Sequence, residues 1–172
     1  FHQLGRIAEE RQQFEEAERW YRKSLALTEK LRNEYGQAIT LHQLGIIAQE
    51  RREFDEAEHW YRKSLALNEK LRNEYGQAGT LHQLGMIAEE RRQFDEAEQW
   101  YRKSLALEEK LKDEYGQALT FHQLGMIAEE RREFDEAERL YVQAEAIFEN
   151  YRDEHNLAIV RSSLERLRRA RA

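Results

Sequence analysis

The 172-residue chain contains no cysteine and no proline. Without cysteine it has no disulfide framework, no thiolate metal site and no cysteine nucleophile, which fits a reducing compartment. We therefore expect a cytoplasmic protein. Long apolar runs are also missing, since none approaches the roughly 20 residues that a membrane-spanning helix needs. The sequence begins at Phe1 without a methionine, inside an expected helix, so we expect it to be part of a larger protein.

Clustered positive charge is scarce as well. The formal net charge is -6 and the isoelectric point is about 5.6, which disfavours general nucleic-acid binding because phosphates demand clustered Lys and Arg. Only the final segment "ERLRRARA" is locally basic. Charged residues make up 36% of the chain and are finely mixed with apolar ones, a pattern typical of helices with salt-bridged outer faces.

What the sequence does contain is a repeat. The segment "LHQLG" occupies positions 41–45 and 81–85, and "FHQLG" occupies 1–5 and 121–125. A period of 40 residues divides the chain into units that each favour one supersecondary structure. The units run about 1–36, 37–76, 77–116 and 117–154, and a shorter, divergent and more basic segment predicts a capping helix at about 156–170.

Each unit predicts a helical hairpin, because the apolar phase breaks at "RREFD" between two stretches of 3.6-residue periodicity. One face of the first helix carries Leu41, Leu44, Gly45 and Ala48. The matching stripe of the second helix carries Phe54, Ala57, Tyr61, Ser64, Leu65 and Leu67. Small residues in both stripes predict close approach of the helices. We expect the left-handed residues that end the second helices to be Gly36, Gly76 and Gly116.

The pattern Leu44-Gly45, Phe54, Ala57 and Tyr61 resembles the tetratricopeptide repeat and recurs in all four units. The 40-residue period, against roughly 34 in the usual repeat, resembles the long form in kinesin light chains and in arrays attached to bacterial signalling ATPases. The resemblance implies an all-α, right-handed α-solenoid of four helix-turn-helix repeats plus a C-terminal capping helix. It also implies a non-catalytic scaffold that binds a peptide or partner helix in a concave groove, as a sensor or adaptor.

The groove should be lined by the face of the first helices that does not contact the hairpin partner. The predicted partner-binding residues are His42, Ile46, Gln49, Glu50, His82, Met86, Glu89, Glu90, His122, Met126, Glu129 and Glu130. Their acidic ladder beside apolar side chains suits a basic segment with apolar anchors; a merely solvated acidic face is the alternative. A second functional hypothesis is end-to-end self-assembly, because the first helix has no preceding unit to cover it.

The recurring histidine has three interpretations: a metal ligand, a ligand contact, or a solvated or glutamate-paired surface residue, which is favoured. Members of the row lie about one helix diameter, roughly 10 Å, apart, too far to share zinc, whose bonds to nitrogen are about 2.0–2.1 Å. Trp60 and its equivalents are expected to pack between second helices rather than to stack on a ligand. Ser64 belongs to the packed stripe, so we expect no catalytic residue, no cofactor and no metal.

Overall fold

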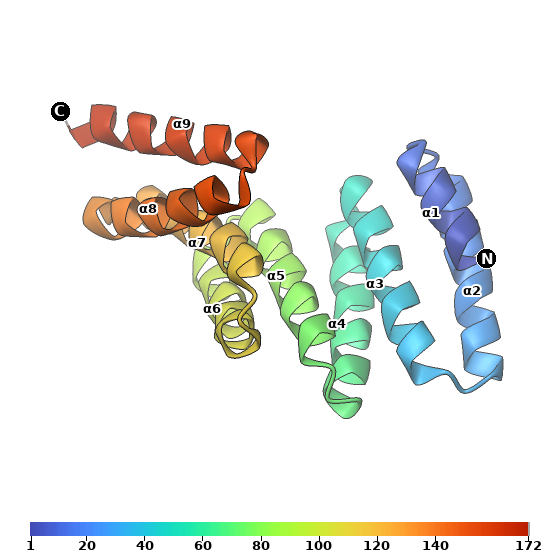
Figure 1. Cartoon of the computed structure of the whole chain (residues 1–172). Coiled ribbons are helices and arrows are strands. Elements are labelled where there is room, and N and C mark those ends of the chain that lie inside the picture. Colours follow the sequence, from blue (N-terminus) through green and yellow to red (C-terminus); the bar gives the residue numbers. More distant parts are fainter. Residues whose placement is uncertain (172) are drawn as a thin grey trace.

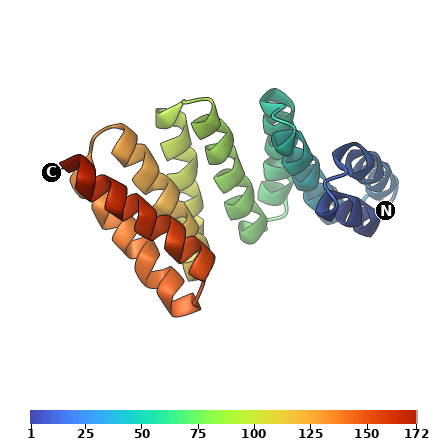
Figure 2. The same cartoon turned by 90° about the horizontal axis from the view of Figure 1, so that it is seen from above.

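The computed structural model describes residues 1–171, which form nine α-helices without strands. The helices are α1 (His2–Glu10), α2 (Phe14–Lys30), α3 (Glu34–Glu50), α4 (Phe54–Lys70), α5 (Glu74–Glu90), α6 (Phe94–Leu111), α7 (Glu114–Glu130), α8 (Phe134–Tyr151) and α9 (Glu154–Arg171). The first eight pack as four consecutive hairpins that follow one another from one end of the molecule to the other (Figure 1). Figure 2 shows the same row from above, with the termini at opposite ends. The predicted all-α solenoid is confirmed.

Each hairpin is closed by contact between a glycine and a tyrosine. Tyr61 of α4 is fully buried, and a Cβ added to Gly45 of α3 would lie 2.5 Å from its ring. Ala57 and Ser64 are buried on the same face of α4, and the Ser64 hydroxyl donates to the backbone carbonyl of Ala38 at 2.8 Å. The small residues of the stripe therefore allow the close approach that their spacing predicts.

The turns between helices use left-handed residues that carry side chains. Arg32 and Arg52 have φ angles of 52° and 59°, and the equivalent residues of the other turns in the described chain are also left-handed. Backbone hydrogen bonds stabilise this conformation: the N–H of Asn33 donates to the carbonyl of Thr28 at 2.9 Å. This bond spans five residues and closes a Schellman motif.

The glycines that we expected at these turns lie instead in the first turn of the next helix. They are Gly36, Gly76 and Gly116, and no described glycine has a positive φ. The N-cap residue Asn33 accepts a hydrogen bond from the Gly36 N–H at 2.9 Å. A Cβ on Gly36 would lie 2.9 Å from the Asn33 side chain and from Thr28. The expectation of left-handed glycines is therefore wrong. The lack of a side chain at these glycines instead leaves space for the N-cap side chain.

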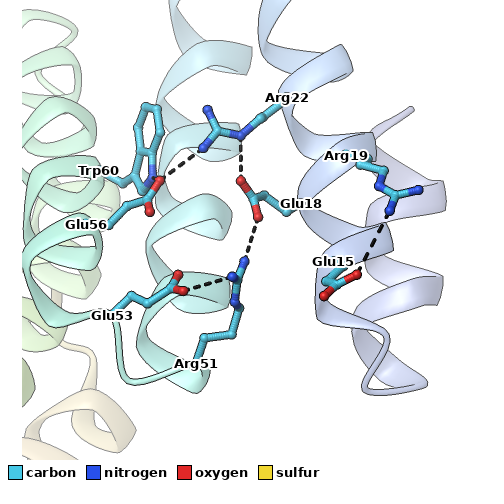
Figure 3. A network of polar contacts seen from close by, with 8 residues as sticks. All are labelled: Glu15, Glu18, Arg19, Arg22, Arg51, Glu53, Glu56 and Trp60. Atoms are coloured by element: carbon cyan, nitrogen blue, oxygen red, sulfur yellow. Dashed lines mark hydrogen bonds and ion pairs between the residues drawn. The ribbon is translucent and has the colours of Figure 1, made fainter.

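Ion pairs join each hairpin to the next. Arg51 follows α3 and donates to Glu18 of α2 at 2.7 Å, and Glu18 also accepts from Arg22, which reaches Glu56 of α4 at 3.0 Å (Figure 3). The same arginine–glutamate bond recurs at Arg91–Glu58, Arg131–Glu98 and Arg171–Glu138. Because the bond repeats with a constant separation of 33 residues, it favours one register between successive hairpins.

Trp60 and Trp100 lie between second helices, as expected, whereas Trp20 of α2 stacks on Phe1 with 5.8 Å between the ring centroids. Trp60 of α4 is buried, and the guanidinium carbon of Arg22 from α2 lies 5.3 Å from the centroid of its ring. Its indole N–H donates to Glu56 at 3.1 Å. A cation over a buried aromatic ring is attracted by the ring quadrupole, by about 0.5–2 kcal/mol.

Helix α9 covers α8 and has the two faces expected of a cap. Leu157, Val160, Leu164 and Leu167 are buried, whereas Glu165 and Arg168 are exposed. Glu165 occupies the position where the preceding first helices carry their packed glycine.

Candidate partner-binding groove

A hollow of about 620 Å³ extends across the first helices of the last two hairpins and α9. Six of the twelve predicted partner-binding residues line it: Met86, Glu89, Glu90, Met126, Glu129 and Glu130. The remaining lining residues are Arg92, Phe94, Gln123 and Arg166. We call this surface the groove hollow. It combines apolar side chains with carboxylates and two arginines.

A row of apolar side chains runs along the groove, with one member in each of the second, third and fourth repeats. Ile46, Met86 and Met126 are half-buried and stand at the same repeat position in α3, α5 and α7. The equivalent positions of α1 and α9 carry the exposed residues Arg6 and Arg166. The apolar row therefore spans three repeats and is bounded by arginine at both ends.

Glu89 and Glu129, each one residue before the end of a first helix, accept hydrogen bonds from the hydroxyls of buried tyrosines. Glu89 accepts a hydrogen bond from the hydroxyl of Tyr101 at 2.7 Å, and burial raises the pKa of Glu89. Gln49 accepts the equivalent bond at 2.8 Å. Glu129 also accepts two hydrogen bonds of 2.8 Å from Arg166, which holds the pKa of Glu129 below its usual value. These side chains thus position helices as well as line the groove.

The acidic residues at the ends of the first helices are Glu50, Glu90 and Glu130. They differ in whether an arginine pairs with them. Two of them pair with an arginine from the turn of the preceding hairpin: Glu90 with Arg52 at 3.5 Å and Glu130 with Arg92 at 3.3 Å. Glu50 has no ion pair within the described chain, because Gln12 stands where the later turns carry arginine. The predicted acidic ladder is therefore not uniform.

The histidines make contacts between repeats. The contacts are His42 Nδ1 to Thr80 Oγ1 (3.2 Å), His82 Nδ1 to Thr120 Oγ1 (3.0 Å) and His122 Nε2 to Ser163 Oγ (3.4 Å). The ring of His42 also lies 5.3 Å from that of Tyr61, measured between centroids. Burial lowers the pKa of His42 and of His82 to about 4, so both are neutral near pH 7. The favoured interpretation, a solvated or glutamate-paired histidine, is wrong for these residues.

Some groove residues were missed from the sequence. Arg52 and Arg92 were not among the predicted partner-binding residues, and neither was Phe94, which lies beside Arg92 in the groove hollow. A signal was present, because an arginine and a glutamate 38 residues apart occur twice in phase with the repeat. This pairing can be recognised only when it is known which surfaces of successive hairpins face each other. Within residues 1–171, no group of three metal-ligating side chains is suitably placed for an ion.

Comparison with known proteins settles the family. The tetratricopeptide repeat model matches residues 1–70 and 76–150. The chain belongs to the tetratricopeptide repeat family. Proteins of this family are in general non-catalytic scaffolds for protein partners. No curated protein matches the chain.

Several solved structures share the fold of this tetratricopeptide repeat protein. BtubC (BKLC) from P. vanneervenii has 22% sequence identity and a TM-score of 0.86, over 97% of this chain and 70% of its own. The nearly identical repeats of a kinesin-light-chain-like protein from Podosopora anserina have 21% identity and a TM-score of 0.77, over 99% and 84%. Aspartyl phosphate phosphatase F from Bacillus subtilis has 12% identity and a TM-score of 0.87, over 96% and 43%. Across residues 1–171, no helix is both long and apolar enough for a bilayer crossing.

Proposed function

We propose that this protein is a scaffold, a sensor or adaptor part of a larger protein, that binds a peptide or helix of a partner protein along the groove. The row of Ile46, Met86 and Met126 carries the proposal, because it offers one half-buried apolar side chain in each of three successive repeats, and Met86 and Met126 line the groove hollow. Apolar anchors in pockets supply most of the affinity in interfaces of this kind. The absence of cysteine fits a cytoplasmic location, which we include in the proposal.

The charges of the groove support a basic residue in the partner near α3. At Glu90 and Glu130, an incoming cation would have to displace Arg52 or Arg92. At Glu50 it would form a new pair with an exposed carboxylate that has no partner in the described chain. We therefore propose a ligand with apolar anchors along the row and a lysine or arginine at Glu50.

The test uses the intact chain and an array of immobilised peptides that carry two or three apolar residues and one lysine at varied spacing. Met86→Glu should weaken capture by at least about tenfold, because it places a charge in the apolar row. Glu50→Lys should weaken capture more than Glu90→Lys does. Capture by the unaltered chain should also weaken as the salt concentration rises, since salt screens an exposed ion pair.

Glu69→Lys is the matched control. Glu69 is exposed on α4 and makes no ion pair in the described chain. Glu58 would be a poor control although it lies outside the groove, because it accepts a hydrogen bond from Arg91 of the next hairpin at 2.6 Å. Equal loss in Met86→Glu and Glu69→Lys, or no loss in either, would contradict the proposal.

A further inference from the structure

One position near the end of the second helices differs between otherwise similar repeats. It holds Thr28 in α2, Asn68 in α4, Glu108 in α6 and Phe148 in α8. Glu108 is only 4% exposed, so a carboxyl group is buried where α6 packs on α7. A buried ionised carboxylate is costly unless it is paired and hydrogen-bonded. The contacts of Glu108 therefore decide which protonation state fits this position.

The hydrogen bonds around Glu108 fit its protonated form. Ser104 Oγ lies 2.7 Å from the carbonyl oxygen of Ala78 and also 2.7 Å from Oε1 of Glu108. Because serine has a single hydroxyl proton, it donates to only one of these two oxygens. When that proton points to Ala78, the contact with Glu108 needs a proton on the carboxyl group. The other carboxyl oxygen, Oε2, is buried and has no hydrogen-bond partner within residues 1–171.

The preceding junction, where α4 packs on α5, carries amides at the same positions. Asn68 Nδ2 donates to Ser64 Oγ at 3.3 Å, and Asn68 Oδ1 accepts from Asn73 Nδ2 at 2.8 Å. Both ends of the Asn68 side chain are satisfied without a titratable group. In the next unit Glu108 replaces Asn68 and Asp113 replaces Asn73. Two carboxyl groups therefore stand where the preceding junction has a pair of hydrogen-bonded amides.

No cation in the described chain pairs with Glu108. The charged residues that act on it most are Asp113 and Glu109, and both are acidic. Lys110 of α6 pairs instead with Glu74 of α5. An ionised Glu108 would thus face a like charge without a compensating one.

A histidine of α5 reaches the same carboxyl group through Thr120 of α7. The Thr120 hydroxyl donates to Glu108 Oε1 at 3.1 Å, and Thr120 Oγ1 lies 3.0 Å from Nδ1 of His82. Burial lowers the pKa of His82 to about 4, so the ring is neutral near pH 7 and supplies no positive charge.

We propose that Glu108 makes the junction between α6 and α7 a pH-sensitive hinge. While Glu108 is protonated, its hydroxyl donates to Ser104 and the two helices stay packed. When that proton leaves to solvent, the carboxylate loses this bond and repels Asp113, and the junction loosens so that the carboxylate reaches water. Burial raises the pKa of Glu108, so the packed form is complete below about pH 4.5 and is lost as the pH rises.

The hinge would divide the groove hollow. Met86 of α5 and Met126 of α7 both line that hollow, and the junction joins the hairpin of α5 to the hairpin of α7. A loosened junction would let the fourth hairpin and α9 move relative to the first three hairpins. This inference goes beyond the proposed function and does not depend on it, because the hinge is measured without a partner.

Pairs of spin labels measure the hinge, and the lack of native cysteine allows cysteines to be placed where they are needed. Cysteines at Lys103 of α6 and Gln143 of α8 span the proposed hinge. Cysteines at Lys63 of α4 and Lys103 span the preceding junction, which is the matched control. All three residues are exposed. Double electron–electron resonance then gives the distribution of distances for each pair.

We expect the 103–143 distribution to be broader than the 63–103 distribution at about pH 7 and to narrow toward the same width at about pH 5, where Glu108 regains its proton. Glu108→Asn together with Asp113→Asn copies the amide pair of the preceding junction, so the 103–143 distribution should be narrow at both pH values. Glu108→Gln is a second variant, because its amide donates to Ser104 at any pH. Circular dichroism checks that the variants fold.

Three results would each overturn the proposal. The first is equal widths of the two distributions at neutral pH. The second is a broad 103–143 distribution that does not narrow as the pH falls. The third is a broad distribution that persists in both the double variant and Glu108→Gln, because its cause would then lie outside the carboxyl pair.

Discussion

Replacing Gly85 by alanine is expected to destabilise the array, whereas the same change at Gly79 in the same helix is expected to stabilise it. A Cβ on Gly85 would lie 2.6 Å from two ring carbons of Tyr101, which is fully buried. A Cβ on Gly79 would have no heavy atom within 4 Å. Both glycines lie inside α5, so the helix preference for alanine applies to both.

The magnitudes follow from two opposing effects. Alanine is favoured over glycine inside a helix by about 0.5–1 kcal/mol, so Gly79→Ala should gain roughly that amount. At Gly85 the same gain is offset by overpacking, which costs about 1–3 kcal/mol. Tyr101 cannot retreat easily, because its hydroxyl donates to Glu89 at 2.7 Å and its ring lies 5.2 Å from that of His82. We therefore expect Gly85→Ala to lose about 1–2 kcal/mol net.

Urea denaturation followed by far-UV circular dichroism measures the difference. Repeat arrays do not always unfold in two states, so midpoints are compared rather than extrapolated free energies. The midpoint should fall for Gly85→Ala and rise for Gly79→Ala. An unchanged or higher midpoint for Gly85→Ala would refute the close glycine–tyrosine contact, and a lower midpoint for Gly79→Ala would refute the open space beside it.

Three further predictions concern buried and paired charges. Burial lowers the pKa of His42 and His82 from 6.5 to about 4, so the stability that depends on their neutral forms is complete above pH 6.5 and is lost as the pH falls toward 4. The thermal unfolding midpoint should therefore fall over this pH range, and changing both histidines to glutamine should make the fall smaller. Burial raises the pKa of Glu108, so the stability that its protonated form contributes is present below about pH 4.5 and is lost as the pH rises. Glu108→Gln should therefore raise the thermal unfolding midpoint at pH 7 more than at pH 4. Arg91→Met should lose about 0.2–1 kcal/mol at low salt and less at high salt, measured by urea denaturation, because it removes the exposed pair with Asp55 and the partly buried one with Glu58.

The hairpins could be predicted from sequence because their contacts are local and repeat. Gly45 and Tyr61 lie within one 40-residue unit, and the 3.6-residue spacing places each on the inner face of its helix. Every copy of the unit carries the same glycine and tyrosine. The helix pairing, the small residues at the contact and the position of Trp60 all followed from this pattern.

Contacts between units could not be predicted in the same way. Periodicity put His42 on a particular face of α3, but it did not reveal that Thr80 of the next hairpin lies against that face. The prediction of the turn residues was wrong for a different reason. Glycine is the usual left-handed residue after a helix, whereas here backbone hydrogen bonds hold Arg32 in that conformation and the nearby Gly36 accommodates an N-cap.

Binding of the proposed partner in the groove would affect contacts between helices, because Glu90 and Glu129 already bind arginines of other elements. A cation that competed for Glu90 would release Arg52 and remove one bond between α5 and the turn after α3. A cation that competed for Glu129 would release Arg166 and loosen α9 from α7. A cation at Glu50 breaks no contact within the described chain. Since the apolar row continues to Met126, the proposed ligand would gain most if its charge lay at the α3 end and its apolar residues extended toward α9.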